Sequence, residues 1–156
     1  MKQASHILCR LFVGVVFILA GAMKVWNVQV AHEPVGHELV IHAASVPDPS
    51  AFVKDVANYQ MLPHALTHLV AITLPWIEVV AGVLLLLGVW VRPSALIIGG
   101  LIVVFLIGIT QALARGLDIH CGCFGTAGGR KVGVTALAED VSFLAATVWI
   151  WWHAKD

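Results

Sequence analysis

Long apolar runs constrain the fold of this chain more than any other feature. A helix needs roughly 20 apolar residues to cross a lipid bilayer, and four runs are long enough for one span each. We therefore predict an all-α fold, a polytopic membrane protein built as a four-transmembrane-helix bundle, with residues 1–156 forming one domain. The predicted spans cover about residues 7–26, 65–91, 94–114 and 132–152.

The composition of the chain supports a membrane environment. Hydrophobic residues make up 60% of the chain and charged residues only 12%, whereas an ordinary soluble domain carries about 25% charged residues. Such a chain cannot cover its surface with polar groups, so we expect the lipid bilayer to be its main partner. The formal net charge is zero and no basic tract is present, which argues against a nucleic-acid partner.

The first apolar run begins after Lys2 and ends near Lys24. A positive start and an apolar core also describe a cleavable signal peptide. The run is long for a signal core, however, and its end is typical of an anchor at the membrane interface. Gly14 and Gly21 predict close approach of another helix, and Cys9 is interpreted as a small buried apolar side chain.

The second run carries a carboxylate, Glu78, near its middle. An ionisable group inside the membrane is costly, and it usually faces the bundle interior with a partner. Arg10 and Lys24 are the candidate cations. The favoured interpretation is a buried ion pair that fixes helix register, and the functional alternative is a proton relay or a contact to a polar headgroup.

A tight turn is expected at Arg92-Pro93, before the third run. That run contains Gly99, Gly100 and Gly108, which we interpret as points of close contact between helices.

The long first loop, about residues 27–64, is predicted to contain one short amphipathic helix over about residues 49–60. Asp48-Pro49 is typical of a helix start. Phe52, Val56 and Tyr59 then fall on one face at helical spacing. Such a helix lies on the membrane surface or caps the bundle.

Histidines recur every five residues in the same loop, at His32, His37 and His42. One helix could not aim all three at one metal ion, but an irregular loop could, together with His64, His68 and His120. Copper or zinc binding is therefore one interpretation, and solvated loop histidines are the other.

Four alternating spans bring distant residues to one side of the membrane. With the N-terminus inside, the outer half of the bundle gathers Lys24, His120, Cys121, Cys123, Glu139 and Asp140. Lys and Arg are divided almost evenly between the two sides, so the positive-inside rule does not decide the orientation. We expect the cysteines on the periplasmic side of the inner membrane, because a cysteine pair is most useful in an oxidising compartment.

The pair Cys121-Gly122-Cys123 is the strongest chemical signal in the chain. A disulfide closed over one glycine forms a small, strained ring, and strain makes a disulfide labile. Neighbouring cations favour a reactive thiolate; these are His120, Arg115, Arg130 and Lys131. A structural disulfide and a pair of soft metal ligands remain open as alternatives.

A set of small, charged and motif residues occurs in a fixed order along nearly the whole chain: Arg10, Gly14, Gly21, Lys24, the run Tyr59-Gln60-Met61-Leu62-Pro63, Glu78, Gly82, Gly88 and the run Cys121-Gly122-Cys123-Phe124-Gly125. With this set the chain resembles the MauE family of methylamine-utilisation membrane proteins, which is akin to the wider DoxX-like group. A longer, more polar loop at residues 28–46 is the main departure.

The resemblance implies a membrane thiol–disulfide redox protein that supports maturation of an exported, cysteine-containing protein, alongside a thioredoxin-like partner. Cys121 and Cys123 would be the redox pair, with His120, Lys24, Glu78, Glu139 and Asp140 as supporting proton or charge residues. A quinone is one candidate electron acceptor, and no haem or flavin motif identifies another. Whether the protein is an enzyme, a thiol–disulfide oxidoreductase, stays open.

Two other functions compete with this one. The first is a protein that handles copper or zinc through Cys121, Cys123, His32, His37, His42 and His120. The second is a non-catalytic membrane partner whose loop disulfide shapes a docking surface.

Overall fold

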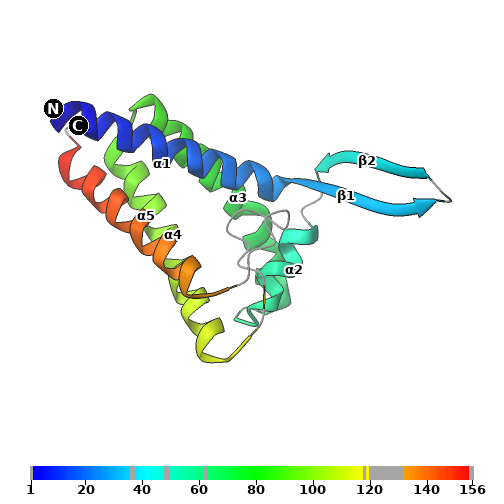
Figure 1. Ribbon diagram of the computed structural model, residues 1–156. Helices are drawn as coiled ribbons and strands as arrows, with labels where there is room; N and C mark the ends of the chain where they lie inside the picture. The colour runs from blue at the N-terminus through cyan, green and yellow to red at the C-terminus, as the bar shows by residue number, and fades with distance from the viewer. Residues whose placement is uncertain are drawn as a thin grey trace.

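The computed structural model describes residues 2–35, 38–47, 50–61, 63–117, 119 and 132–154, with the backbone alone for residues 2–4, 26–35, 38–47, 50–51 and 64. Four long helices dominate it (Figure 1), and each is long and apolar enough to cross a membrane. The predicted four-helix membrane bundle is therefore confirmed. Its helices are α1 (Lys2–Val25), α3 (His64–Leu87), α4 (Val91–Ala114) and α5 (Val134–His153).

Helix α3 ends four residues earlier than predicted, because Gly88 stops it. Gly88 adopts the left-handed conformation (φ 78°). Its N–H donates to the Leu85 carbonyl, and the N–H of Val89 donates to the Leu84 carbonyl, at 3.3 and 3.1 Å. This pair of bonds is a Schellman motif, which satisfies carbonyls that the helix end leaves open.

The turn lies a few residues earlier in the chain than Arg92-Pro93, where we expected it. The chain reverses at Gly88 to Trp90, and Pro93 already lies in the first turn of α4. Proline is tolerated there, since the N–H groups of the first turn have no partner within the helix.

Helices α1 and α3 form the most extensive helix–helix contact, and glycines permit it. A Cβ atom on Gly14 would lie 3.0 Å from the carbonyl oxygen of Gly82, and one on Gly82 would lie 2.9 Å from that of Gly14. A Cβ on Gly21 would lie only 2.7 Å from the carbonyl oxygen of Pro75. The predicted close approach at Gly14 and Gly21 is confirmed, because any larger side chain would push the two backbones apart.

The same interpretation is wrong for most of the α4 glycines. No described atom would lie within 4 Å of a Cβ on Gly100, and a Cβ on Gly99 would make only ordinary contacts with Thr147 and Leu144 of α5. Gly108 does make a close contact, but with the ring of Tyr59 rather than with a helix. Small residues on an apolar run do not by themselves show which face is packed.

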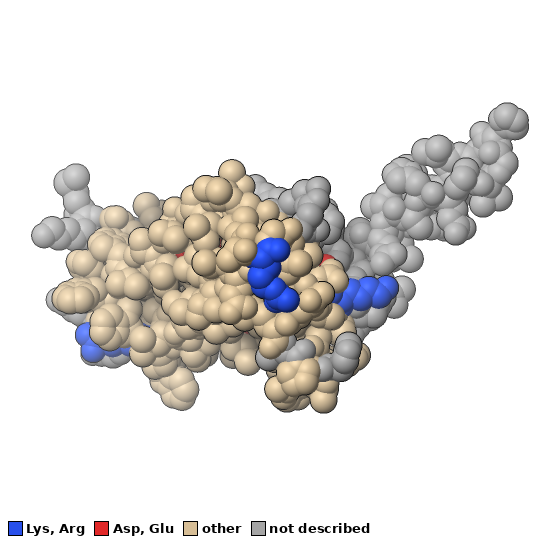
Figure 2. Space-filling view, turned by 90° about the horizontal axis from the view of Figure 1, so that it is seen from below, with Lys and Arg blue, Asp and Glu red and all other residues tan. Residues whose placement is uncertain are grey.

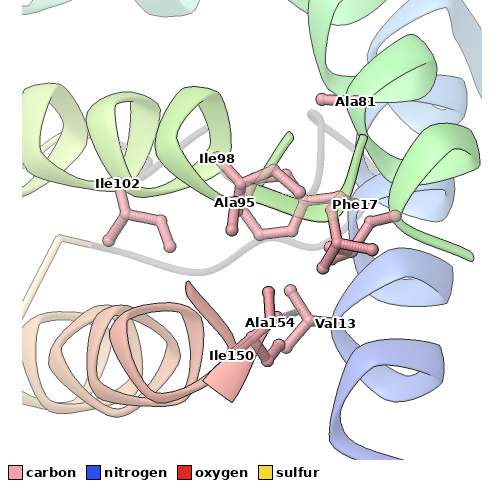
Figure 3. Close-up of a cluster of buried hydrophobic side chains, with 10 residues drawn as sticks. Val13, Phe17, Ala81, Ala95, Ile98, Ile102, Ile150 and Ala154 are labelled. Atoms are coloured by element: carbon pink, nitrogen blue, oxygen red, sulfur yellow. The ribbon is translucent and has the colours of Figure 1, made fainter. Parts of the chain in front are cut away.

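The main core lies where α1, α3, α4 and α5 meet. Figure 3 shows Val13 of α1 beside Ile150 of α5, with Ile98 of α4 near them; all three side chains are fully buried. Outside this core, large apolar side chains such as Trp76 of α3, 59% exposed, face outward along every span. Figure 2 shows one such face, on which charged side chains are few and isolated. An outer surface of this kind is suited to lipid, and the chain is an integral membrane protein.

An antiparallel hairpin follows α1, where the sequence led us to expect an irregular loop. It comprises β1 (Trp26–Val35) and β2 (Glu38–Pro47) and projects from the bundle at the end of α1 (Figure 1). Valines alternate with polar residues along the start of β1, which is the period of a strand. This alternation is the local signal for the hairpin.

The predicted short helix is confirmed as α2 (Ser50–Asn58). Phe52 is buried against Ala71 and Leu74 of α3, with Leu101 and Phe105 of α4 packed around them. Of the two places expected for this helix, α2 therefore occupies the end of the bundle as a cap.

Candidate functional site

A buried ion pair joins α1 to α3. The Lys24 ammonium donates hydrogen bonds to both carboxylate oxygens of Glu78, at 2.6 and 2.8 Å. Lys24 is 3% exposed and Glu78 is 1% exposed. The interpretation of Glu78 as half of a buried ion pair is confirmed, with Lys24 as its partner. The interpretation of Lys24 as an interfacial anchor is wrong, since its side chain turns inward to the carboxylate.

Gly21 makes this pairing possible. It lies one turn before Lys24, and a Cβ there would meet the Cβ of Glu78 at 3.2 Å. The absence of a side chain lets the two backbones approach until a lysine on one helix reaches a carboxylate on the other. A charge pair buried in the membrane needs such geometry, because removal of each ion from water costs several kcal/mol.

Two aromatic rings enclose the ammonium from other elements. The Lys24 Nζ atom lies 5.4 Å from the centre of the Phe52 ring on α2 and 4.8 Å from that of Phe105 on α4. A cation at this range is attracted to the face of an aromatic ring. Lys24 thus contacts α2, α3 and α4, and its position depends on the packing of all three.

Asp140 of α5 is a second carboxyl group at this place. It lines a cavity of about 30 Å³ together with Glu78, Phe105 and Phe143. Its Oδ2 atom is buried and makes no hydrogen bond to any residue that the structure describes, and the carboxylate interacts electrostatically with Lys24. A cavity of this size can hold a water molecule.

Tyr59 and Asp55 extend this group of polar side chains towards the end of the bundle. Asp55 lies on α2 and is 6% exposed. Burial of the Tyr59 phenol, together with the negative charges of Asp55 and Asp140, raises its pKa to about 12. The phenol is therefore a neutral O–H donor at any physiological pH. We call the five residues Lys24, Asp55, Tyr59, Glu78 and Asp140 the polar cluster.

The residues that flank the cysteine segment are hydrogen-bonded to each other. The Val132 N–H donates to the Ile119 carbonyl at 2.8 Å, which joins the two ends of that segment. Arg115, after the last turn of α4, donates to the carbonyl of Tyr59 and to the side chain of Gln60, both at 3.3 Å. The last turn of α4 is thereby tied to the chain after α2.

The predicted redox residues His120, Cys121 and Cys123 lie outside the described residues, as do Arg130 and Lys131. Their roles stay predictions.

The other predicted site residues are partly brought together. Lys24, Glu78 and Asp140 meet in the bundle interior, and Glu139 lies close enough to Asp140 for their charges to interact. Arg10, the other candidate partner of Glu78, lies against Gly88 at the far end of α3 instead.

The metal alternative is not tested by the described side chains. His32 and His42 lie in the hairpin, where the backbone register pairs them with Ile41 and Ala31, and His37 lies outside the described residues. Among the side chains that are described, no three His, Cys, Asp or Glu residues are grouped so as to hold a metal ion.

Four members of the site were not predicted from the sequence: Phe52 and Phe105 as ring contacts of Lys24, Asp55 as an acid, and Tyr59 as a phenol near the carboxylates. A signal for Asp55 existed, because it follows Phe52 by three residues and so falls on the same face as Val56 and Tyr59. A carboxylate within an apolar helix face indicates a buried polar contact.

Comparison with known proteins supports one family. The family model described as methylamine utilisation protein MauE matches residues 2–153, nearly the whole chain. No curated protein and no solved structure matches the chain significantly.

Proposed function

The chain belongs to the MauE family, and we propose that it is a membrane thiol–disulfide redox protein that supports disulfide formation in an exported partner. Cys121 and Cys123 form the redox pair. The partner is a thioredoxin-like or other cysteine-containing protein. The cysteine pair faces the periplasm from the inner membrane, where thiol oxidation is favoured.

One observation carries the proposal beyond family membership. Asp140, a partly buried residue whose Oδ2 atom is buried and makes no hydrogen bond to any described residue, lies on the helix that directly follows the cysteine segment. From Val134, the first residue of α5, to Asp140 the helix rises about 9 Å at roughly 1.5 Å per residue. Thiol oxidation releases protons, and a group that can accept them near the segment's end supports this chemistry.

The proposed exchange starts from the oxidised motif. A partner thiolate attacks one motif sulfur, the Cys121–Cys123 bond breaks, and a mixed disulfide forms. The partner's second thiolate then attacks the mixed disulfide, which releases the motif as a dithiol and leaves the partner with a disulfide. Two electrons have moved from the partner to the motif. His120, next to Cys121 in the sequence, favours the thiolate form of the motif.

The polar cluster has two roles in this proposal. Asp140 donates a proton to a motif thiolate that the exchange releases, and it accepts a proton when that thiol ionises again on reoxidation of the motif. The Lys24–Glu78 pair holds α1 against α3 and keeps a positive charge near Asp140.

The test uses purified protein in detergent with a two-cysteine peptide. Oxidised wild-type protein should convert the reduced peptide to its disulfide, one peptide per chain. Cys123→Ser, mixed with the oxidised peptide, should accumulate a mixed disulfide through Cys121. Cys9→Ser is the matched control, since Cys9 lies within α1 and is partly buried against the core, and it should react like the wild type. If Cys121→Ser and Cys123→Ser both oxidise the peptide at the wild-type rate, the proposal is wrong.

A further inference from the structure

A pocket of about 190 Å³ lies between α2, α3 and α4, next to the polar cluster. Phe52 and Asp55 of α2, Tyr59 after it, and Val104 and Phe105 of α4 line it. Gly108 lines it as well, and the ring of Tyr59 lies over this glycine, 3.4 Å from where a Cβ would be. We propose that this pocket binds the ring of a membrane quinone. This inference rests on the function proposed above, because the quinone would be the electron acceptor of the cysteine pair.

The size of the pocket fits one ring. An apolar cavity of about 150 Å³ in another protein takes up benzene, so 190 Å³ accommodates a single substituted ring. Phe52, Tyr59 and Phe105 supply aromatic walls, and flat rings prefer to stack on or meet the edge of other rings. A wide or branched ligand would not fit.

The polar groups of the pocket match both redox states of such a ring. A quinone has carbonyl oxygens that accept hydrogen bonds, and the phenol of Tyr59 is a donor. A quinol has hydroxyl groups that donate, and the carboxylate of Asp55 is an acceptor. The phenol stays protonated because its pKa is raised to about 12.

The pocket lies where a lipid-soluble ligand can enter it. Val104 is 59% exposed and Met61 is 40% exposed, and both line the pocket. Val104 lies on a membrane-spanning helix, so its exposed surface faces lipid. A ring can enter there from the bilayer and leave its isoprenoid tail among the lipid chains.

The pocket also adjoins the polar cluster, whose acidic groups would transfer protons to the reduced ring. Phe52 and Phe105 line it and contact the Lys24 ammonium, and Phe105 separates it from the cavity of Glu78 and Asp140. In the balanced reaction, two motif thiols become a disulfide, and their two electrons and two protons convert the quinone to a quinol.

Photolabelling with an azidoquinone tests the pocket directly. The protein carries Cys121→Ser and Cys123→Ser, is held in lipid nanodiscs, and is digested after illumination. We expect labelled peptides from residues 52–61 or 104–108, and labelling that decylubiquinone prevents. In the same background, Val104→Phe should block the entrance and reduce labelling about tenfold, which corresponds to about 1.4 kcal/mol. Val103→Phe is the matched control, since Val103 is also exposed on α4 but does not line the pocket, and it should label normally.

Two results would overturn the inference. One is undiminished labelling of a folded Val104→Phe variant. The other is equal protection by decanoic acid, which would identify a groove for acyl chains. If Val104→Phe does not fold, Tyr59→Phe takes its place, and loss of the phenol hydrogen bond should weaken protection by decylubiquinone about tenfold; unchanged protection contradicts the inference. Because the photolabelled variant lacks both motif cysteines, its labelling does not depend on redox activity. Absence of labelling would therefore contradict the quinone pocket alone, and absence of peptide oxidation would contradict the proposed redox function alone.

Discussion

The Lys24 ammonium lies 2.6 and 2.8 Å from the two carboxylate oxygens of Glu78, and this pair fixes α1 against α3 in the bundle interior. Removal of one partner leaves the other charge buried without compensation. We expect Lys24→Met or Glu78→Met to lower the free energy of unfolding by about 3–5 kcal/mol. The double variant Lys24→Met/Glu78→Met should recover most of this loss, as measured by unfolding in mixed detergent micelles. A double variant as unstable as the sum of the two single ones would show that the pair is not coupled.

Glycines on two helices should respond oppositely to alanine. Gly21→Ala places a Cβ 2.7 Å from the Pro75 carbonyl oxygen, so α1 and α3 must separate, and stability should fall by about 1–3 kcal/mol. Gly100→Ala adds a Cβ atom that no described atom approaches within 4 Å. This variant should leave the free energy of unfolding unchanged, or raise it by up to about 1 kcal/mol because alanine has a higher helix propensity than glycine. The same unfolding assay serves for both. Equal losses at the two positions would refute the packing described for α1 and α3.

Tyr59 offers a spectroscopic test of the polar cluster, because it is the only tyrosine in the chain. Absorbance at the phenolate band should titrate near pH 12 in the folded protein and near pH 10 after unfolding. The unfolded phenol ionises first as the pH rises, so stability should decrease between pH 10 and pH 12.

Charge removal should shift this titration. Asp140→Asn removes one of the negative charges that raise the pKa of Tyr59 and should lower the titration midpoint. Ser142→Ala, a change on the exposed side of α5, should leave it in place. An identical midpoint in Asp140→Asn and wild type would mean that Asp140 does not lie near the phenol.

The apolar runs predicted the number and approximate positions of the spans, because only a helix satisfies every backbone group within lipid. Their ends were harder to predict. Gly88 stops α3 through its backbone conformation, whereas the apolar pattern continues past it. The alternation along β1 covers only a few residues, which is too short to distinguish a strand from an irregular loop.

The candidate site was predictable only in part. Topology placed Lys24 and Asp140 in the same half of the bundle, and both interact there. The choice between Lys24 and Arg10 as the partner of Glu78 depended on the register of α1 against α3, which Gly14, Gly21 and Gly82 determine through three-dimensional contact. Phe52 and Phe105 reach Lys24 from different helices, and no local pattern encodes such a meeting.

Proton transfer by Asp140 should appear in the kinetics of peptide oxidation. Asp140→Asn should slow the reaction about tenfold or more near neutral pH, because a positioned acid–base group contributes at least that much. Asp140→Glu restores the carboxyl group and should recover most of the rate. The Asp140→Asn rate should also depend less on pH than the wild-type rate. Equal rates and pH profiles in Asp140→Asn and wild type would rule out this role.

The proposed function depends above all on Cys121 and Cys123 forming a reducible pair on the outer side of the membrane. A membrane-impermeant maleimide, applied to intact spheroplasts that express a Cys9→Ser variant, measures both properties together. We predict no labelling at first and labelling of both cysteines after mild reduction. Full labelling without reduction, or labelling only after the membrane is opened, would contradict the proposal.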